Sequence, residues 1–177
     1  MVHTDRLFLL PLTVPALELY LQGNNLFEQV ESLACINRVV NPEVKRYVES
    51  VTLPCMRRAP FDHYLFFTFW LVVQKSSGLV VAELGFKGPP GAAGEVEIGY
   101  GTMEHVRNRG FMTEAVGGLV QWASQRQEIS AVLAETAMTN TGSIRVLQKN
   151  GFEQYDQRGE MLWWRTRFSQ KSGFTPV

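Results

Sequence analysis

Two different hydrophobic repeats follow one another within residues 95–138, and no other feature restricts the fold as strongly. Residues 95–103 begin with alternating polar and apolar side chains, the period-2 pattern of a strand. Residues 112–127 instead place apolar side chains on one helical face, and residues 130–138 read as a second strand. A strand–helix–strand unit of this length predicts two parallel strands joined by a right-handed crossover.

The rest of the chain predicts short elements around this unit. Strands are expected at residues 5–13, 64–74, 79–86, 152–155 and 161–168. Helices are expected at residues 15–22, from Pro42 onward and at 141–150. Loops are expected at residues 52–62, which hold two prolines, and at 87–94. The predicted fold class is therefore α/β (α+β), with a mixed, mostly antiparallel central sheet and helices on both faces.

Composition and charge limit the kinds of protein that this chain can be. With 177 residues, 45% of them hydrophobic and 19% charged, it suits one globular domain, predicted at 1–168 with a flexible tail at 169–177. Lys+Arg and Asp+Glu number 17 each, so no basic excess points to a nucleic-acid partner. A neutral total still allows a local basic patch.

Signals for membranes, secretion and metals are weak. The longest apolar run, residues 64–73, is shorter than the roughly 20 residues of a membrane-spanning helix. No cleavage site follows residues 1–12, so no signal peptide and no membrane partner are expected, and a cytoplasmic location is predicted. Two cysteines, Cys35 and Cys55, and three scattered histidines form neither a disulfide framework nor a zinc pattern, so no metal is expected.

The loop before the predicted helix has the composition of an anion site. Arg107, Asn108, Arg109 and Gly110 come directly before the helix, whose first N–H groups lack intrahelical acceptors. A glycine there lets the backbone approach a ligand closely, and two arginines add positive charge. An ordinary strand–helix turn with solvated arginines would look the same.

Two further patterns allow a functional and a structural interpretation. Gly99 and Gly101 flank Tyr100 within a strand, which marks either a close backbone approach by a ligand arm or a local packing kink. Asn140 and Ser143 lie at the start of the helix expected at 141–150, where they either cap the helix or contact a ligand.

Taken together, these motifs resemble the GCN5-related N-acetyltransferases, and most closely the branch of ribosomal-protein alanine N-acetyltransferases. The matching residues are Glu97-Ile98-Gly99-Tyr100, Arg107-x-x-Gly110, Thr113-Glu114-Ala115, Asn140-x-x-Ser143 and Asn150-Gly151-Phe152. The strand that starts at Val81 and the Asp5-Arg6-Leu7 opening add to the likeness, which is sharpest over residues 79–156. No one of these motifs is specific alone, but their joint order and spacing is.

The resemblance implies a sheet that splays open between the parallel strands 95–103 and 130–138, with acetyl-CoA in the split. It implies that pantetheine pairs with backbone near Tyr100, Thr102 and Met103, and that Asn140 bonds to the pantetheine arm. The pyrophosphate would lie on the backbone amides of Arg107, Asn108, Arg109, Gly110, Phe111 and Met112. Relatives usually have Gly or Ala where this chain has Met112, whose side chain we expect to point into the core.

The implied reaction is direct attack of an amine on the acetyl thioester, which requires a neutral amine. A lysine-type amine with a pKa near 10.4 is only about one part in 10³ neutral at pH 7, whereas an α-amine near 8 is roughly a tenth neutral. The candidate bases are Glu97, on the coenzyme strand, and Glu83, each of which could instead be a solvated or paired carboxylate. The oxyanion donor is expected to be a backbone N–H near Thr102.

The departing thiolate needs a proton. Many relatives place a tyrosine four residues before the glycine of the Gly-Phe pair, and here that position is Leu147. Ser143 is the alternative donor, unless it only caps the helix. The predicted function is thus an acetyl-CoA-dependent N-acetyltransferase acting on a protein N-terminus or a small amine, as a monomer or homodimer. Leu147 and Met112 favour the alternative, a non-catalytic acyl-CoA-binding regulatory domain.

Overall fold

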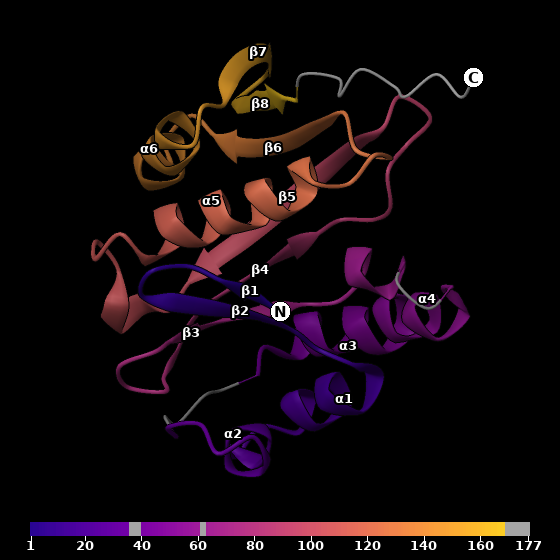
Figure 1. The fold of residues 1–177 in the computed structure, drawn as a ribbon, viewed down its shortest axis with the longest axis vertical. Helices are drawn as coiled ribbons and strands as arrows, with labels where there is room; N and C mark the ends of the chain where they lie inside the picture. Colours follow the sequence, from indigo (N-terminus) through magenta and orange to yellow (C-terminus); the bar gives the residue numbers. More distant parts are fainter. Residues whose placement is uncertain (36–39, 61–62, 169–177) are drawn as a thin grey trace, which may run out of the picture.

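A computed structural model describes residues 1–35, 40–60 and 63–168 of the chain. Within them, eight strands form one sheet in the order β1-β2-β3-β4-β5-β6-β8-β7 (Figure 1). The strands are β1 (Val2–His3), β2 (Leu7–Pro11), β3 (Trp70–Gln74), β4 (Val80–Phe86), β5 (Glu95–Thr102), β6 (Ala131–Ala137), β7 (Glu153–Arg158) and β8 (Met161–Arg167). Neighbouring strands pair antiparallel, except that β5 and β6 pair parallel. The predicted mixed sheet is confirmed.

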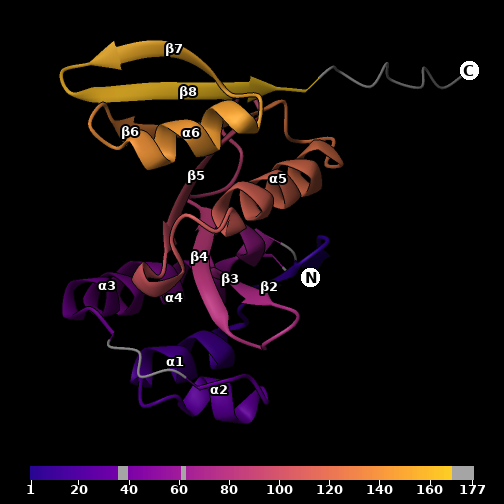
Figure 2. The same cartoon turned by 90° about the vertical axis from the view of Figure 1, so that its left-hand side faces the viewer.

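Helices cover both faces of this sheet. They are α1 (Val14–Gln22), α2 (Leu26–Val30), α3 (Pro42–Tyr47), α4 (Leu53–Arg58), α5 (Phe111–Ser124) and α6 (Thr141–Lys149). Figure 2 shows α5 on one side of the strands and α3 and α4 on the other. The crossover from β5 to β6 runs through α5, as the change in hydrophobic spacing predicts. Among the described residues, no helix combines the length and the apolar character that crossing a membrane would need.

The side chains of β3 alternate between two cores. Trp70 and Val72 pack with α5 residues such as Val116 and Leu119 in one core. Leu71 and Val73 pack in the other core with residues from α1 and α4. Because successive strand side chains point to opposite faces, one strand buried on both sides holds the two helical layers together.

Residues 52–62, predicted as a loop, are largely helical, so that prediction is wrong. A π-helical turn over Val48–Thr52 joins α3 to α4, and the Leu53 N–H donates to the Val48 carbonyl. Pro54 lies in the first turn of α4, and the widened turn before it accommodates the missing N–H of the proline. Residues 61 and 62 lie outside the described residues.

The prediction of a strand at residues 64–74 is also wrong over the first half of that range. His63–Phe66 forms a 3-10 turn, and β3 begins only at Trp70. The apolar run is continuous because Phe66 is buried in the core beside α5, and a solid apolar run does not distinguish strand from turn. The Trp70 indole N–H donates to the Leu65 carbonyl (3.0 Å) and closes this turn. The domain boundary at 168 stays a prediction, and the tail at 169–177 lies outside the described residues.

Candidate active site

The sheet divides where its two parallel strands part. The β5–β6 register joins Glu95 with Ala131 and ends with Ile98 opposite Ala134. Beyond this point, residues 99–102 of β5 continue beside β4, whereas the end of β6 continues beside β8. The strands therefore share only their first halves, and the split lies beside Gly99, Tyr100 and Gly101.

A cavity of about 860 Å³ lies beside this split, between the start of α5 and the start of α6. We call it the loop cavity, because the loop at 107–110 forms much of its wall. It is lined by nine of the ten residues predicted to bind coenzyme: Tyr100, Thr102, Arg107, Asn108, Arg109, Gly110, Phe111, Met112 and Asn140. The tenth, Met103, is partly buried against the hydrophobic cores and donates its backbone N–H to the Val81 carbonyl (3.0 Å).

The loop turns sharply into α5. Asn108 and Gly110 have positive φ angles of 62° and 77°. Glycine adopts this left-handed conformation without the steric cost of a Cβ, and Asn tolerates it better than most residues. A Cβ at Gly110 would lie 3.4 Å from Nη2 of Arg6, at the lower limit of ordinary van der Waals contact.

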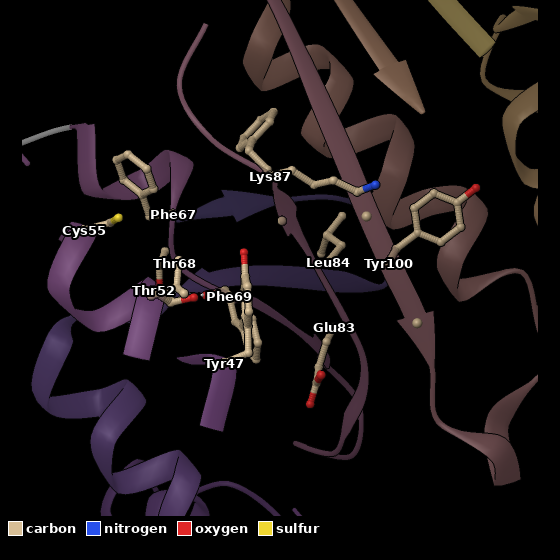
Figure 3. A pocket seen from close by; sticks show the side chains of 15 residues that line it. Tyr47, Thr52, Cys55, Phe67, Thr68, Phe69, Glu83, Leu84, Lys87 and Tyr100 are labelled. Carbon is tan, nitrogen blue, oxygen red and sulfur yellow. Dashed lines mark hydrogen bonds between the residues drawn. The ribbon is translucent and has the colours of Figure 1, made fainter. Parts of the chain in front are cut away.

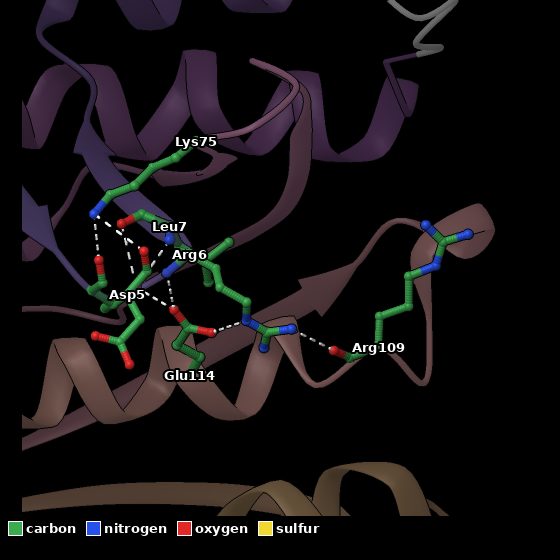
Figure 4. A network of polar contacts seen from close by, with 7 residues as sticks. Asp5, Arg6, Leu7, Lys75, Arg109 and Glu114 are labelled. Carbon is green, nitrogen blue, oxygen red and sulfur yellow. Dashed lines mark hydrogen bonds and ion pairs between the residues drawn. The ribbon is translucent and has the colours of Figure 1, made fainter.

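Arg6 and Glu114 fasten this loop to the edge of the sheet (Figure 4). One carboxylate oxygen of Glu114 accepts from the Arg6 backbone N–H (2.8 Å), and the other accepts from Arg6 Nε (2.6 Å). Arg6 Nη1 donates in turn to the Arg109 carbonyl (3.2 Å). The guanidinium also lies 5.0 Å from the ring centre of Phe111. Arg6 thus connects the backbone of the loop to the first turn of α5.

This arrangement favours the ionised form of the Glu114 carboxyl group. Partial burial alone would raise the pKa of its carboxyl, but hydrogen bonds from Thr4 and Arg6 and the charge of Arg6 outweigh burial and lower it. Residues 6 and 114 carried the family resemblance in the sequence, yet no pattern there indicated that they pair. They are 108 positions apart, so only the fold brings them together.

At the start of α6, the residue that caps the helix also lines the loop cavity. The Asn140 side-chain carbonyl accepts from the Ser143 backbone N–H (3.1 Å), so Asn140 caps the helix. The Ser143 hydroxyl is free of that cap and lies 2.8 Å from the Tyr100 hydroxyl. Burial raises the pKa of Tyr100, against a smaller opposite effect of the Ser143 hydrogen bond, so the phenol keeps its proton.

The two residues that depart from the family pattern are both buried. Met112 is 6% exposed and packs in the core beside α5, as the helical spacing predicts, although it also lines the loop cavity. Leu147 is fully buried in the same core. Its side chain has no proton to donate.

A second cavity, of about 540 Å³, lies where the α3–α4 helical segment faces β4 and β5 (Figure 3). We call it the apolar cavity, and it shares Tyr100 and Gly101 with the loop cavity. Tyr47 of the α3–α4 segment lines it, whereas Phe27 is fully buried in the core. Sequence reasoning missed Phe67 and Phe69, because they fall in the segment predicted as a strand.

The two candidate bases lie in different surroundings. Glu83 lines the apolar cavity and accepts a hydrogen bond from the hydroxyl of buried Tyr20. Glu97 lines neither of these two cavities and pairs with Lys87, whose Nζ is 2.5 Å from its carboxylate. Lys87 also pairs with Glu135 of β6 (2.9 Å). Burial lowers the pKa of Lys87, but its hydrogen bonds to Glu97 and Glu135 and their charges outweigh burial and raise it. Glu97 is therefore engaged in an ion-pair network.

A basic loop at a helix start, beside parted parallel strands and next to a second cavity, suits a transferase that uses an acyl-CoA donor. The chain belongs to the GNAT acetyltransferase family, because the model described as "Acetyltransferase (GNAT) domain" matches residues 6–153.

Individual relatives agree with this assignment. The chain is 34% identical over 98 residues to the uncharacterized N-acetyltransferase YjdG of Bacillus subtilis (strain 168). That match spans 55% of this chain and 58% of the relative's length. In fold, it is similar to the ribosomal-protein-S5-alanine acetyltransferase of Vibrio fischeri, with a TM-score of 0.65, 13% identity and 98% of each chain covered. The ribosomal L7/L12 alpha-N-protein acetyltransferase RimL, solved with coenzyme A, gives a TM-score of 0.64 at 15% identity, covering 95% of this chain and 97% of RimL.

Proposed function

We propose that this protein transfers an acetyl group from acetyl-CoA to a primary amine, either a protein N-terminus or a small amine. The observation that carries the proposal is that the loop cavity and the apolar cavity meet at Tyr100 and Gly101. A donor in one cavity would thus adjoin an acceptor in the other. The similar folds of RimL and of the S5-alanine acetyltransferase, both named as acetyltransferases, support the class of reaction.

The loop cavity suits coenzyme A in charge and shape. Arg107 and Arg109 line it beside the N-terminus of α5, the arrangement that favours a pyrophosphate. A Cβ at Gly101 would meet no atom within 4 Å, so the β5 backbone is open on that side. Residues 107–112 would hold the pyrophosphate, and residues 100–102 with Asn140 would hold the pantetheine arm.

Residues on both sides of the junction would perform the chemistry. Glu83 accepts a proton from the attacking amine, whose nitrogen forms the new bond to the acetyl carbon while the carbon–sulfur bond breaks. A backbone N–H near Thr102 stabilises the charge on the acetyl oxygen. Ser143 donates a proton to the departing thiolate and recovers one from Tyr100 or solvent, since the two hydroxyls lie 2.8 Å apart. Because Glu97 lines neither cavity and its carboxylate is paired with Lys87, we assign the base role to Glu83.

Acetyl-CoA is expected to stabilise the folded protein. At a hundredfold excess over Kd, a ligand that binds only the folded state adds about 2.7 kcal/mol to the free energy of unfolding. Thermal or urea unfolding with and without acetyl-CoA measures this gain. Thiol release with an amine panel then distinguishes catalysis from binding alone, because a regulatory domain would show stabilisation without release.

Two glycine variants would locate the binding site. Gly110→Ala and Gly151→Ala place a Cβ on backbone with similar φ angles, 77° and 73°, so each adds comparable backbone strain. Gly151 is outside the loop cavity, and a Cβ there meets no atom within 4 Å. Only Gly110→Ala should weaken stabilisation by acetyl-CoA. Equal stabilisation of both variants, or none in the parent protein, would contradict the assigned site.

Replacing Ser143 by alanine tests the proton donor without removing the helix cap. The cap uses the Ser143 backbone N–H, which an alanine retains. We expect kcat to fall about tenfold, below the usual range for general acids because a thiolate leaves readily, with the KM for acetyl-CoA unchanged. An unchanged kcat would mean that Ser143 only participates in capping.

A further inference from the structure

The residues that line the apolar cavity restrict which acceptors can bind there. One wall comes from the helical segment 42–58, where Tyr47, Val51 and Cys55 recur at spacings of four residues. Such spacing places them on one helical face. Phe67 and Phe69 form part of the wall next to them, before β3 begins (Figure 3). A substituent in this cavity therefore meets mainly aromatic and aliphatic side chains.

Three glycines of β4 and β5 line the floor of the cavity, which therefore has no side chains at these positions. Gly85 of β4 pairs with Gly99 of β5, and Gly101 follows two residues later on the same face. A Cβ at Gly101 would meet no atom within 4 Å, whereas a Cβ at Gly85 would lie 2.8 Å from the Thr68 carbonyl oxygen. The Thr68 backbone thus covers Gly85, whereas the β5 backbone is bare at Gly101, where the apolar cavity meets the loop cavity.

Only one charged side chain in the described lining of this cavity is available to bind an acceptor. Among the described residues that line it, the charged side chains are Glu83 and Lys87. Lys87, which follows β4, extends across β5 to Glu97 and Glu135, at 2.5 and 2.9 Å. Its ammonium is thus already paired with two carboxylates. Glu83 is the remaining charge, and its bond from Tyr20 holds the carboxylate in place.

These features define which acceptors fit. A single carboxylate suits one ammonium group, so an acceptor with several cations would leave the others in an apolar environment. A free amino acid brings a carboxylate next to its amine, which needs a cation that this cavity does not offer. Serine-like side chains would lose hydrogen bonds to water against the aromatic wall.

We propose that the acceptor is a monocationic primary amine joined to an apolar or aromatic group, with no carboxylate beside the amine. This proposal rests on the proposed N-acetyltransferase function and names its substrate class. Two sources share this chemistry: a peptide N-terminus with an apolar first side chain, and a small arylalkyl amine. Glu83 binds the ammonium, and the wall around Phe67, Phe69 and Val51 binds the apolar group.

The first test compares acceptors in a thiol-release assay. Phenylalanine amide should give a kcat/KM at least about tenfold above that of serine amide, because one apolar group in a fitted pocket discriminates by about 10- to 200-fold. Spermidine should be poorer than both. Phenethylamine and a peptide amide that begins with phenylalanine distinguish the two sources. Turnover that favours serine amide or spermidine would overturn the proposal and leave the acetyltransferase function intact.

A second test uses two matched lysine variants. Val51 and Val44 lie on the same helical segment and are similarly exposed, 41% and 40%, but only Val51 lines the cavity. Val51→Lys should raise kcat/KM for phenylalanine relative to phenylalanine amide by about tenfold, because the new cation faces the carboxylate. Val44→Lys should not change this ratio. Phenylalanine and phenylalanine amide differ in amine pKa, but this difference is the same for every variant. It therefore cancels when the kcat/KM ratio of the two acceptors is compared between variants.

Binding provides a readout that does not need turnover. In the presence of coenzyme A, phenylalanine amide should shift the unfolding temperature of the parent protein more than serine amide does. If thiol release fails with every amine while this shift persists, the catalytic function is refuted and the binding preference stands. Equal shifts by the two amides, or an equal response of both lysine variants, would refute the binding preference itself.

Discussion

Glu83→Gln is expected to lower kcat/KM for an α-amine acceptor by about 10²- to 10⁴-fold at pH 7, the usual contribution of a general base. The substitution keeps the size of the side chain and one acceptor oxygen for the Tyr20 hydroxyl. It removes the carboxylate that lines the apolar cavity. Steady-state kinetics with a varied acceptor measures the loss, and stabilisation by acetyl-CoA should be unchanged because Glu83 is outside the loop cavity.

Glu97→Gln provides the matched comparison. Glu97 is also on the strands beside the split, but it lines neither cavity and its carboxylate is paired with Lys87. We expect it to change kcat/KM by less than about threefold, far below a general-base effect. The Glu83→Gln deficit should also shrink at about pH 9, where an α-amine is already neutral. A large loss in Glu97→Gln with little in Glu83→Gln would reverse the assignment.

Local patterns were enough to predict most of the sheet. The change in period over residues 95–138 predicts the parallel pair, because side-chain spacing depends only on backbone geometry. Most residues of the predicted coenzyme site lie close together because the end of β5 and the following loop are neighbours along the chain, whereas Asn140 joins them only through the pairing of β5 with β6. Met103 is the exception, because its side chain packs against the cores instead of lining the cavity.

Contacts between distant segments could not be predicted from a single sequence. The bond from Tyr20 to Glu83 joins residues 63 positions apart and distinguishes Glu83 from Glu97. The apolar cavity depends on the helical segment 42–58, where Pro54 reads as a helix breaker until a π-helical turn accommodates it. Phe67 and Phe69 belong to an apolar run that is typical of a strand, and only the tertiary structure places them in a cavity wall.

Glu114→Gln is expected to lower the free energy of unfolding by about 2 kcal/mol at pH 7, because hydrogen bonds to a charged group contribute about 1.5–3 kcal/mol. Its carboxylate accepts from Thr4 Oγ1 (2.6 Å), from the Arg6 backbone N–H and from Arg6 Nε. A neutral amide cannot satisfy all three donors. Urea unfolding measures the loss, and Glu49→Gln, in an exposed pair with Lys45, should cost less than about 0.5 kcal/mol.

The loss in Glu114→Gln should depend on pH in a defined direction. The folded-state pKa of Glu114 is lowered from 4.5, so near that pH the unfolded chain binds more protons at this site than the folded one. The stability that Glu114 contributes is therefore complete above about pH 4.5 and disappears as the pH falls through the lowered pKa. The stability difference between the parent protein and the variant should thus be constant near neutral pH and narrow below about pH 4.5. A difference that widened with acid would contradict the network.

The same variant should affect the coenzyme site at a distance. Arg6 connects Glu114 to the Arg109 carbonyl, so a weaker hold on Arg6 allows the loop more conformations. Coenzyme binding must then order the loop again, and the KM for acetyl-CoA should rise severalfold while kcat at saturation changes little. Because Glu114 is outside the loop cavity, direct contact with coenzyme would not explain such a rise. A lower stability with an unchanged KM would mean that the network supports the fold without positioning the loop.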